Sequence, residues 1–171
     1  NHPVKELVWV GRLNASIVAT TTGDTAGGNQ WFNFTNAADS SGTNGTGGSG
    51  TNCITGKTRL QLNGHDRFSE RDSGYFNWVQ PYQHHSGCPT AGVNVYSFGL
   101  TPEEHQPSGT CNFSRIDNAQ LVGSALKVDT FDAIDAIGLS NHADSVKLTI
   151  FAVNYNVLRI MSGMGGLAYS N

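Results

Sequence analysis

Apolar residues along this chain fall into short runs separated by long polar stretches. Residues 57–62 alternate between polar and apolar side chains, which is the pattern of a strand with one buried face. Residues 7–10 form a continuous apolar run, and residues 146–153 are apolar on both faces from Ile150 onward. Such runs are typical of strands that are covered on both sides.

Two further strands are expected at residues 93–100 and 120–128, which are rich in β-branched, aromatic or other apolar residues. Residues 157–161 would continue the strand at 146–153, and the glycines that follow would interrupt the tail.

One short helix is expected between the strands at residues 57–62 and 93–100. Residues 69–72 resemble a capping box, which marks the start of a helix. The helix would bury Tyr75, Trp78 and Val79 on one stripe and would end at Pro81.

Residues 20–53 are expected to form one long exposed loop. Within them, residues 40–52 contain only Ser, Thr, Gly and Asn. Such a stretch buries too little apolar surface to offset the entropy lost on ordering. Trp31, Phe32 and Phe34 interrupt the polar composition, and we expect them to pin the loop to the body.

These elements predict a single all-β domain over residues 1–171. Five main strands, at most one or two short helices and large loops are typical of a sandwich or a jelly roll.

The charge of the chain argues against direct binding of nucleic acid. Only 13% of residues are charged, the formal net charge is -3, and no basic run is present. No apolar run reaches the length of a transmembrane segment.

The candidate ligands for a metal have unsuitable spacing, so we predict no metal and no cofactor. Cys53, Cys88 and Cys111 are widely separated and form no CxxC pair. The adjacent residues His84 and His85 should diverge and form separate hydrogen bonds at the junction between helix and loop.

No group of residues suggests catalysis, so we predict a protein that is not an enzyme. Glu103 and Glu104 are adjacent, and adjacent side chains in a strand point to opposite faces. His65 and Asp66 lie in a turn, and no GxSxG motif accompanies them.

Four sequons for N-glycosylation occur, at Asn14, Asn33, Asn44 and Asn112. Asn44 lies in the most polar part of the predicted loop and is the best candidate acceptor. Asn112 is expected to have a structural role instead.

Residues 101–117 are expected to form a structured corner between two strands. Prolines and Gly109 give its first part the composition of turns, and Phe113 and Ile116 can anchor the rest. The residues that we assign to this corner are Glu103, Glu104, His105, Gln106, Pro107, Ser108, Gly109, Cys111, Asn112 and Arg115.

The corner closely resembles the signature of the major capsid proteins of nucleocytoplasmic large DNA viruses. Four other segments resemble the same family in the same order, and all five together lie at residues 1–9, 60–68, 75–85, 103–117 and 154–171.

The resemblance implies a viral jelly-roll sandwich. Members of this family carry two jelly rolls in tandem, each with eight strands, B to I, in sheets of order B-I-D-G and C-H-E-F. The five predicted strands resemble E to I of the second jelly roll, and counterparts of B, C and D are absent. Residues 1–171 would then be the C-terminal part of a capsid protein and would not fold alone.

The resemblance also implies a structural function. The expected protein is a homotrimer that forms pseudo-hexagonal capsomers in the icosahedral shell of a virion. Its partners would be neighbouring capsomers and penton and minor capsid proteins, with assembly in the host cytoplasm. The alternative is a jelly-roll module on the virion surface that binds a carbohydrate or a receptor through Trp31 and Phe32.

Overall fold

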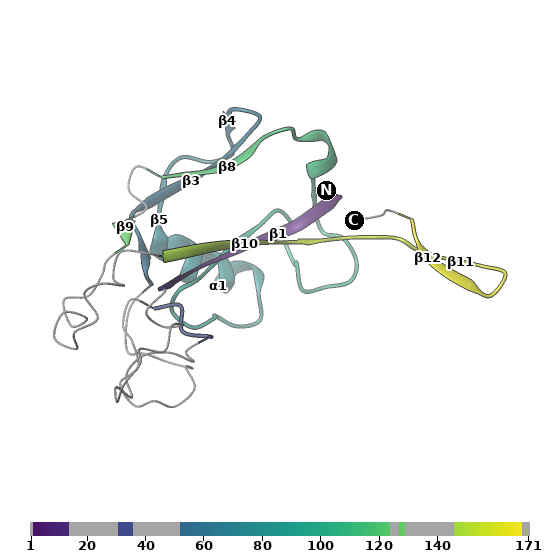
Figure 1. The fold of residues 1–171 in the computed structure, drawn as a ribbon, viewed down its shortest axis with the longest axis horizontal. Helices are drawn as coiled ribbons and strands as arrows, with labels where there is room; N and C mark the ends of the chain where they lie inside the picture. The colour runs from purple at the N-terminus through teal and green to yellow at the C-terminus, as the bar shows by residue number, and fades with distance from the viewer. Residues whose placement is uncertain (1, 14–30, 36–51, 124–126, 129–145, 169–171) are drawn as a thin grey trace, which may run out of the picture.

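The computed structural model describes residues 2–13, 31–35, 52–123, 127–128 and 146–168. Two small antiparallel sheets pack against each other in this part of the chain (Figure 1). The first sheet has the order β10-β1-β6, with β7 also paired to β1; these strands are β1 (Pro3–Leu13), β6 (Val93–Ser97), β7 (Cys111–Asn112) and β10 (Val146–Asn154).

The second sheet is built around the strand that alternation predicted. β3 (Lys57–Leu62) pairs with β8 on one side and with two short strands on the other. These neighbours are β4 (His65–Asp66), β5 (Arg71–Asp72) and β8 (Ala119–Gly123). Thr58 and Leu60 face the core, as the alternation predicted, and Lys57 is exposed. The turn after β3 has positive φ at Asn63 and Gly64.

The first strand of the chain is the centre of the first sheet. β1 pairs antiparallel with β10 over nearly its whole length and with β6 along part of its other edge. The strand at residues 7–10 is the first of the five predicted strands and was expected to correspond to strand E. In the sheet order C-H-E-F, strand E would place β1 in the same sheet as β3 and β8. Instead β1 lies between β10 and β6, so the strand order contradicts that placement.

The core lies between the two sheets and under the helical segment. Its buried residues are Val4, Leu7, Trp9, Cys53, Ile54, Leu60 and Phe76. The rings of Trp9 and Phe76 meet edge to face, with centroids 5.0 Å apart. Cys53 completes the core at the end of β1, where its thiol donates to the Gly11 carbonyl at 3.0 Å.

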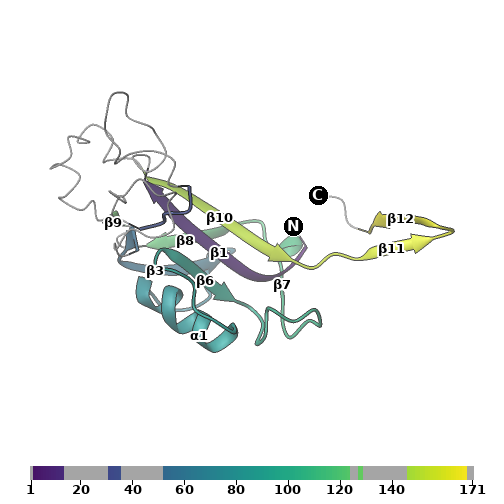
Figure 2. The ribbon, with the colours of Figure 1, turned by 90° about the horizontal axis from the view of Figure 1, so that it is seen from below.

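The helical segment exists, but its buried stripe was predicted correctly only at Tyr75, which is partly buried and packs against the core. It comprises η2 (Tyr75–Val79) and α1 (Gln80–His84), and Figure 2 shows it beside β6. The buried residues are Phe76, Asn77, Gln80 and Pro81, whereas Trp78 and Val79 are exposed.

The predicted start and end of this helix also need correction. Residues 71 and 72, taken as part of a capping box, form β5, because they pair with Thr58 and Lys57 of β3. Pro81 does not end the helix, because a proline is tolerated in the first turn, where α1 holds it. A further short helix, η3 (Phe113–Arg115), follows β7.

The loop predicted at residues 20–53 is not exposed throughout its described parts. Asn33, Thr35, Asn52 and Cys53 are buried, and Thr35 and Asn52 form an isolated β-bridge. Asn52 Nδ2 donates to Asn94 Oδ1 at 2.7 Å and the Cys53 thiol donates to the Gly11 carbonyl, so hydrogen bonds attach this end of the segment to the body. Of the three aromatic residues that we expected to pin it, Trp31 and Phe32 are exposed and Phe34 is partly buried. Most of the remaining loop lies outside the described residues.

The end of the chain forms a hairpin instead of continuing β10. β11 (Leu158–Met161) pairs with β12 (Met164–Leu167), and both views show this hairpin extending from one end of the molecule (Figures 1 and 2). A separate two-stranded sheet joins β2 (Ile54–Thr55) to β9 (Lys127–Val128).

Candidate functional site

The corner that follows β6 is closed by contacts between its two arms. Ser108 Oγ accepts a hydrogen bond from the Thr101 amide at 2.9 Å, which joins the two arms, and within the first arm Ser97 Oγ donates to the Gly99 carbonyl at 2.6 Å. A Cβ on Gly99 would lie 2.9 Å from the Gly109 carbonyl oxygen. The close approach of these two backbones therefore requires glycine.

The corner is also fixed to the rest of the fold. The Glu103 carboxylate accepts from the Ser86 amide at 3.1 Å, just beyond α1, and the hydrogen bonds from Ser86 hold the pKa of Glu103 below its ordinary value. The Glu104 carbonyl accepts from the Tyr155 hydroxyl at 3.4 Å. The corner thus connects α1 to the segment that leads into the C-terminal hairpin.

Most of the corner residues face solvent despite these attachments. Gly109 and Cys111 are partly covered, and Pro102, next to them in the corner, is buried. The exposed members are Glu103, Glu104, His105, Gln106, Pro107, Ser108, Asn112 and Arg115. A polar surface held in a fixed shape can be recognised by a partner at a low entropic cost.

The two adjacent histidines diverge, as predicted. His84 Nδ1 lies 2.9 Å from the Leu100 carbonyl oxygen, and it must donate because a carbonyl only accepts. His85 Nε2 lies 2.8 Å from Glu6 Oε2, with both side chains mostly buried. These contacts attach the end of α1 to the corner and to β1.

The described residues hold no group of three or more His, Cys, Asp or Glu side chains that could bind a metal ion. Cys53 is buried, Cys88 is exposed and Cys111 is intermediate, and all three thiols are free. Among the described residues, no helix is long and apolar enough to cross a membrane.

Two of the four sequons lie in the described part of the chain. Asn33 is 1% exposed, and its Oδ1 accepts from the amide and hydroxyl of Thr35, so burial argues against Asn33 as an acceptor in the folded chain. Asn112 is exposed, but its Oδ1 caps η3 by accepting from the Ser114 amide at 3.0 Å. Asn14 and Asn44 lie outside the described residues.

Apolar side chains of β10 are exposed, as expected for the apolar strand at residues 146–153 when neighbouring strands are absent. Leu148, Ile150, Phe151 and Val153 are between 36% and 55% exposed. β10 pairs with β1 on one edge, and its other edge has no partner strand within the described residues. Sequence pattern identifies an apolar strand, but it does not show which neighbours are present.

Trp31 and Phe32 were the basis of the alternative function, and both are exposed. The Arg12 guanidinium lies over the Trp31 ring, with Cζ 5.5 Å from its centroid. One side of this aromatic residue is therefore already occupied by the protein itself.

Comparison with known proteins agrees with the fold. Residues 1–166 match the family model described as large eukaryotic DNA virus major capsid protein. The chain is 63% identical to the major capsid protein of Phaeocystis pouchetii virus over 115 residues, covering 66% of the chain and 20% of that protein. It is 42% identical to the major capsid protein of Pyramimonas orientalis virus, covering 100% of the chain and 37% of that protein.

A solved structure also matches the whole chain. A quasi-atomic model of the PBCV-1 virus capsid aligns with a TM-score of 0.66 at 38% identity, covering 100% of this chain and 44% of the matched chain. The chain therefore spans less than half the length of each of these relatives.

Strand content, sheet arrangement and structural likeness define a viral jelly-roll protein. The chain belongs to the family of large eukaryotic DNA virus major capsid proteins.

Proposed function

We propose that this chain is part of a major capsid protein that self-assembles into the icosahedral shell of a large DNA virus. The observation that carries the proposal is the apolar surface of β10, which is left exposed in a chain of the capsid family. Exposed contiguous apolar surface of this kind marks a place where another protein segment packs.

The strand order supports the position of the chain within a jelly roll. In the sheet B-I-D-G, strand D lies between I and G. β1 lies between β10 and β6, which were assigned to I and G, so we assign β1 to D. β3 lies between β8 and β5, which fits strand E between H and F. The chain then supplies strands D to I, one more than the sequence suggested.

The assignment explains which side of the sandwich is open. Strand B would pair with the free edge of β10, and strand C would pair with the edge of β8 that lacks a partner among the described residues. Strand B would satisfy the unpaired backbone groups of β10, and B and C together would cover the face of β10 that carries Leu148 and Ile150. We propose that these strands come from residues outside this sequence.

The proposed assembly is a homotrimer whose tandem jelly rolls form a pseudo-hexagonal capsomer. Its partners are neighbouring capsomers and the penton and minor capsid proteins, and it assembles in the host cytoplasm before residing in the virion. Self-association is supported by the capsid structure that the chain resembles. The protein acts by surface complementarity and burial, without catalytic turnover.

Native mass spectrometry and electron microscopy of the purified capsid protein test this function. We expect particles with the mass of three chains and a pseudo-hexagonal outline. A strictly monomeric protein under conditions in which it is folded would contradict the proposal.

A further inference from the structure

The C-terminal hairpin is built as a separate unit with a defined turn. Ser162 and Gly163, between the paired residues Met161 and Met164, both have positive φ, at 51° and 80°. Two positive values in a two-residue loop are the geometry of a type I′ turn, whose twist matches that of the flanking strands.

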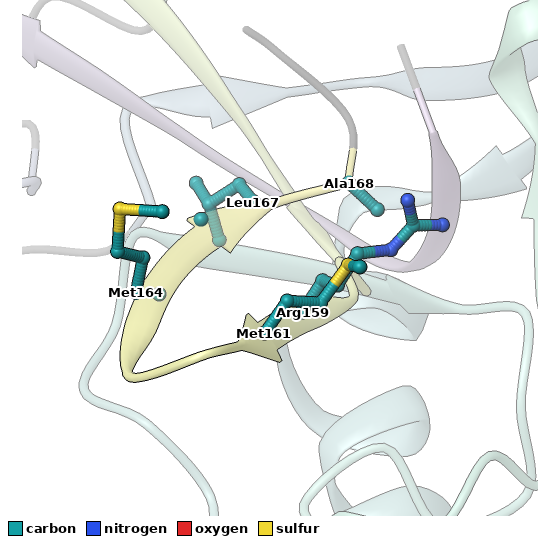
Figure 3. Close-up of a pocket in the computed structure, with 7 residues that line it drawn as sticks. Arg159, Met161, Met164, Leu167 and Ala168 are labelled. Atoms are coloured by element: carbon teal, nitrogen blue, oxygen red, sulfur yellow. The ribbon is translucent and has the colours of Figure 1, made fainter.

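The side chains of the hairpin are apolar on both faces. Leu158, Ile160 and Leu167 share one face, because opposite residues in an antiparallel pair point the same way. They are between 61% and 69% exposed. The other face carries Met161 and Met164 together with Arg159, which line a shallow hollow with Gly166 and Ala168 (Figure 3).

An isolated two-stranded hairpin is only marginally stable in water. This one projects beyond the body in both views, and the described body does not cover its apolar side chains (Figures 1 and 2). Its main support is its own pairing, which the bond from the Ala168 amide to the Val157 carbonyl extends. A partner is therefore needed to bury either face.

The segment leading to the hairpin is fixed in position. The Tyr155 amide donates to the Pro3 carbonyl at 2.9 Å, and Lys5 Nζ lies 5.3 Å from the centroid of the Tyr155 ring. The Tyr155 hydroxyl donates to Glu104 of the corner. These contacts direct the hairpin away from the described body, so the surface that receives it lies outside that body.

The same chain presents a surface that complements the hairpin. Trp78 and Tyr82, four residues apart on the helical segment, are 54% and 81% exposed, and Leu100 is 72% exposed. Leu100 is held beside the end of α1 by the bond from His84. We call these three residues, with Val79, the helix patch.

Charge also favours this pairing. Residues 73–110 contain no Lys or Arg, and their acidic residues are Glu103 and Glu104, which are exposed just after Leu100. Residues 154–168 contain one charged residue, Arg159. An apolar hairpin with a single positive charge is therefore complementary to an apolar patch with a negative edge.

We propose that the hairpin β11–β12 of one copy packs on the helix patch of a second copy of this chain through the face that carries Arg159, Met161 and Met164, with Arg159 near Glu103 and Glu104. This proposal rests on the proposed self-assembly. The contact joins two different surfaces, and repetition around a closed ring would satisfy every copy.

Cross-linking of the assembled protein tests the contact. Cys88 is exposed, and its sulfur lies 3.9 Å from the Trp78 carbonyl oxygen, so it provides a native thiol beside the helix patch. The variant Met164→Cys places a second thiol at the hairpin turn. With a flexible bismaleimide, we expect covalent species with the mass of two and three chains. The control Met164→Cys with Cys88→Ser should lose them.

The outcomes separate this proposal from the proposed function. An oligomer that yields no interchain product, or only a link within one chain, would overturn the docking contact and leave self-assembly intact. An unsubstituted protein that remains monomeric would overturn both.

A second variant tests the energetics. Met161→Asp, on the hairpin face that carries Arg159, should weaken the oligomer at least about tenfold, which a charge placed in an apolar contact readily causes. His65→Asp, at an exposed position in β4, should leave association unchanged. Equal association constants for the two variants would also overturn the contact.

Discussion

Trp9 and Ile150 stand directly opposite each other in the ladder between β1 and β10 and therefore share a face of the sheet. Trp9 is 2% exposed, whereas Ile150 is 47% exposed. The core that covers Trp9 thus ends before it reaches the next strand. The increase in exposed fraction from Trp9 to Ile150 shows that β10 lies on the open side of the sandwich.

The first prediction concerns Ile150 in the assembled capsid protein. If strands from outside these residues cover β10, Ile150→Ala will create a cavity and reduce the free energy of unfolding by about 2–4 kcal/mol. Phe32→Ala is the matched control, because Phe32 is exposed on a loop, and it should change stability by less than about 0.5 kcal/mol. Denaturant unfolding of both variants measures the difference. Equal small effects would mean that Ile150 remains solvent-exposed.

The second prediction concerns the close contact between Gly92 and Phe34. A Cβ on Gly92 would overlap the Phe34 carbonyl, and φ at Gly92 is 96°. Gly92→Ala should therefore cost about 3 kcal/mol from overpacking and from the left-handed backbone. Gly64→Ala has a similar φ of 81° but meets nothing within 4 Å, so it should cost only about 1 kcal/mol. A Gly92 variant as stable as the Gly64 variant would show that residues 31–35 do not pack there.

Glu103 provides a prediction about pH. The hydrogen bonds from Ser86 hold the pKa of this carboxyl below its ordinary value. Their stabilisation is present above the pKa of the unfolded chain and is lost as the pH falls through the lowered pKa of the folded state. Amide hydrogen exchange at residues 84–88 should be faster in Glu103→Gln than in the parent at neutral pH, and this difference should disappear in acid.

Glu104→Gln is the control for this experiment, since no hydrogen bond to the Glu104 carboxylate is found in the described part of the chain. The parent and Glu104→Gln should exchange alike at residues 84–88. A pH-independent difference for Glu103→Gln would contradict the role of its charge.

The three thiols should differ in reactivity. Burial raises the pKa of Cys53 to about 11, so at pH 8 roughly one thiol in a thousand is ionised. Cys88 is exposed and should react with iodoacetamide in the native protein, whereas Cys53 should react only after unfolding. Peptide mass spectrometry after timed labelling measures both rates. Rapid native labelling of Cys53 would contradict its place in the core beside Gly11.

Much of the fold could be predicted from the pattern of apolar and polar residues along the chain. The bounds of β3 follow from alternation, and the turn at Asn63 and Gly64 follows from its residue types. The position of β1 within the sheet could not be predicted, because periodicity identifies a strand but not the strands that pair with it. Its pairing with β10 joins residues that are far apart in sequence.

The surfaces proposed for association were harder to predict. Trp78 looks like a core residue on a helical stripe, yet the fold buries Asn77 instead, which donates to the Val93 carbonyl at 2.7 Å. The Ser162-Gly163 pair was the signal that could have revealed the hairpin, because such dipeptides between apolar runs mark turns. Exposure itself depends on which elements are missing, and local sequence does not encode this.

The central claim is that residues 1–171 are an incomplete jelly roll that strands outside these residues complete. The most direct test is to express residues 1–171 alone and record near-ultraviolet circular dichroism during thermal unfolding. We expect no cooperative transition, because an open core and a missing set of ladder bonds outweigh the roughly 5–15 kcal/mol by which domains are stable. A soluble monomer that unfolds cooperatively would contradict the claim and would show that the described sheets form a self-sufficient sandwich.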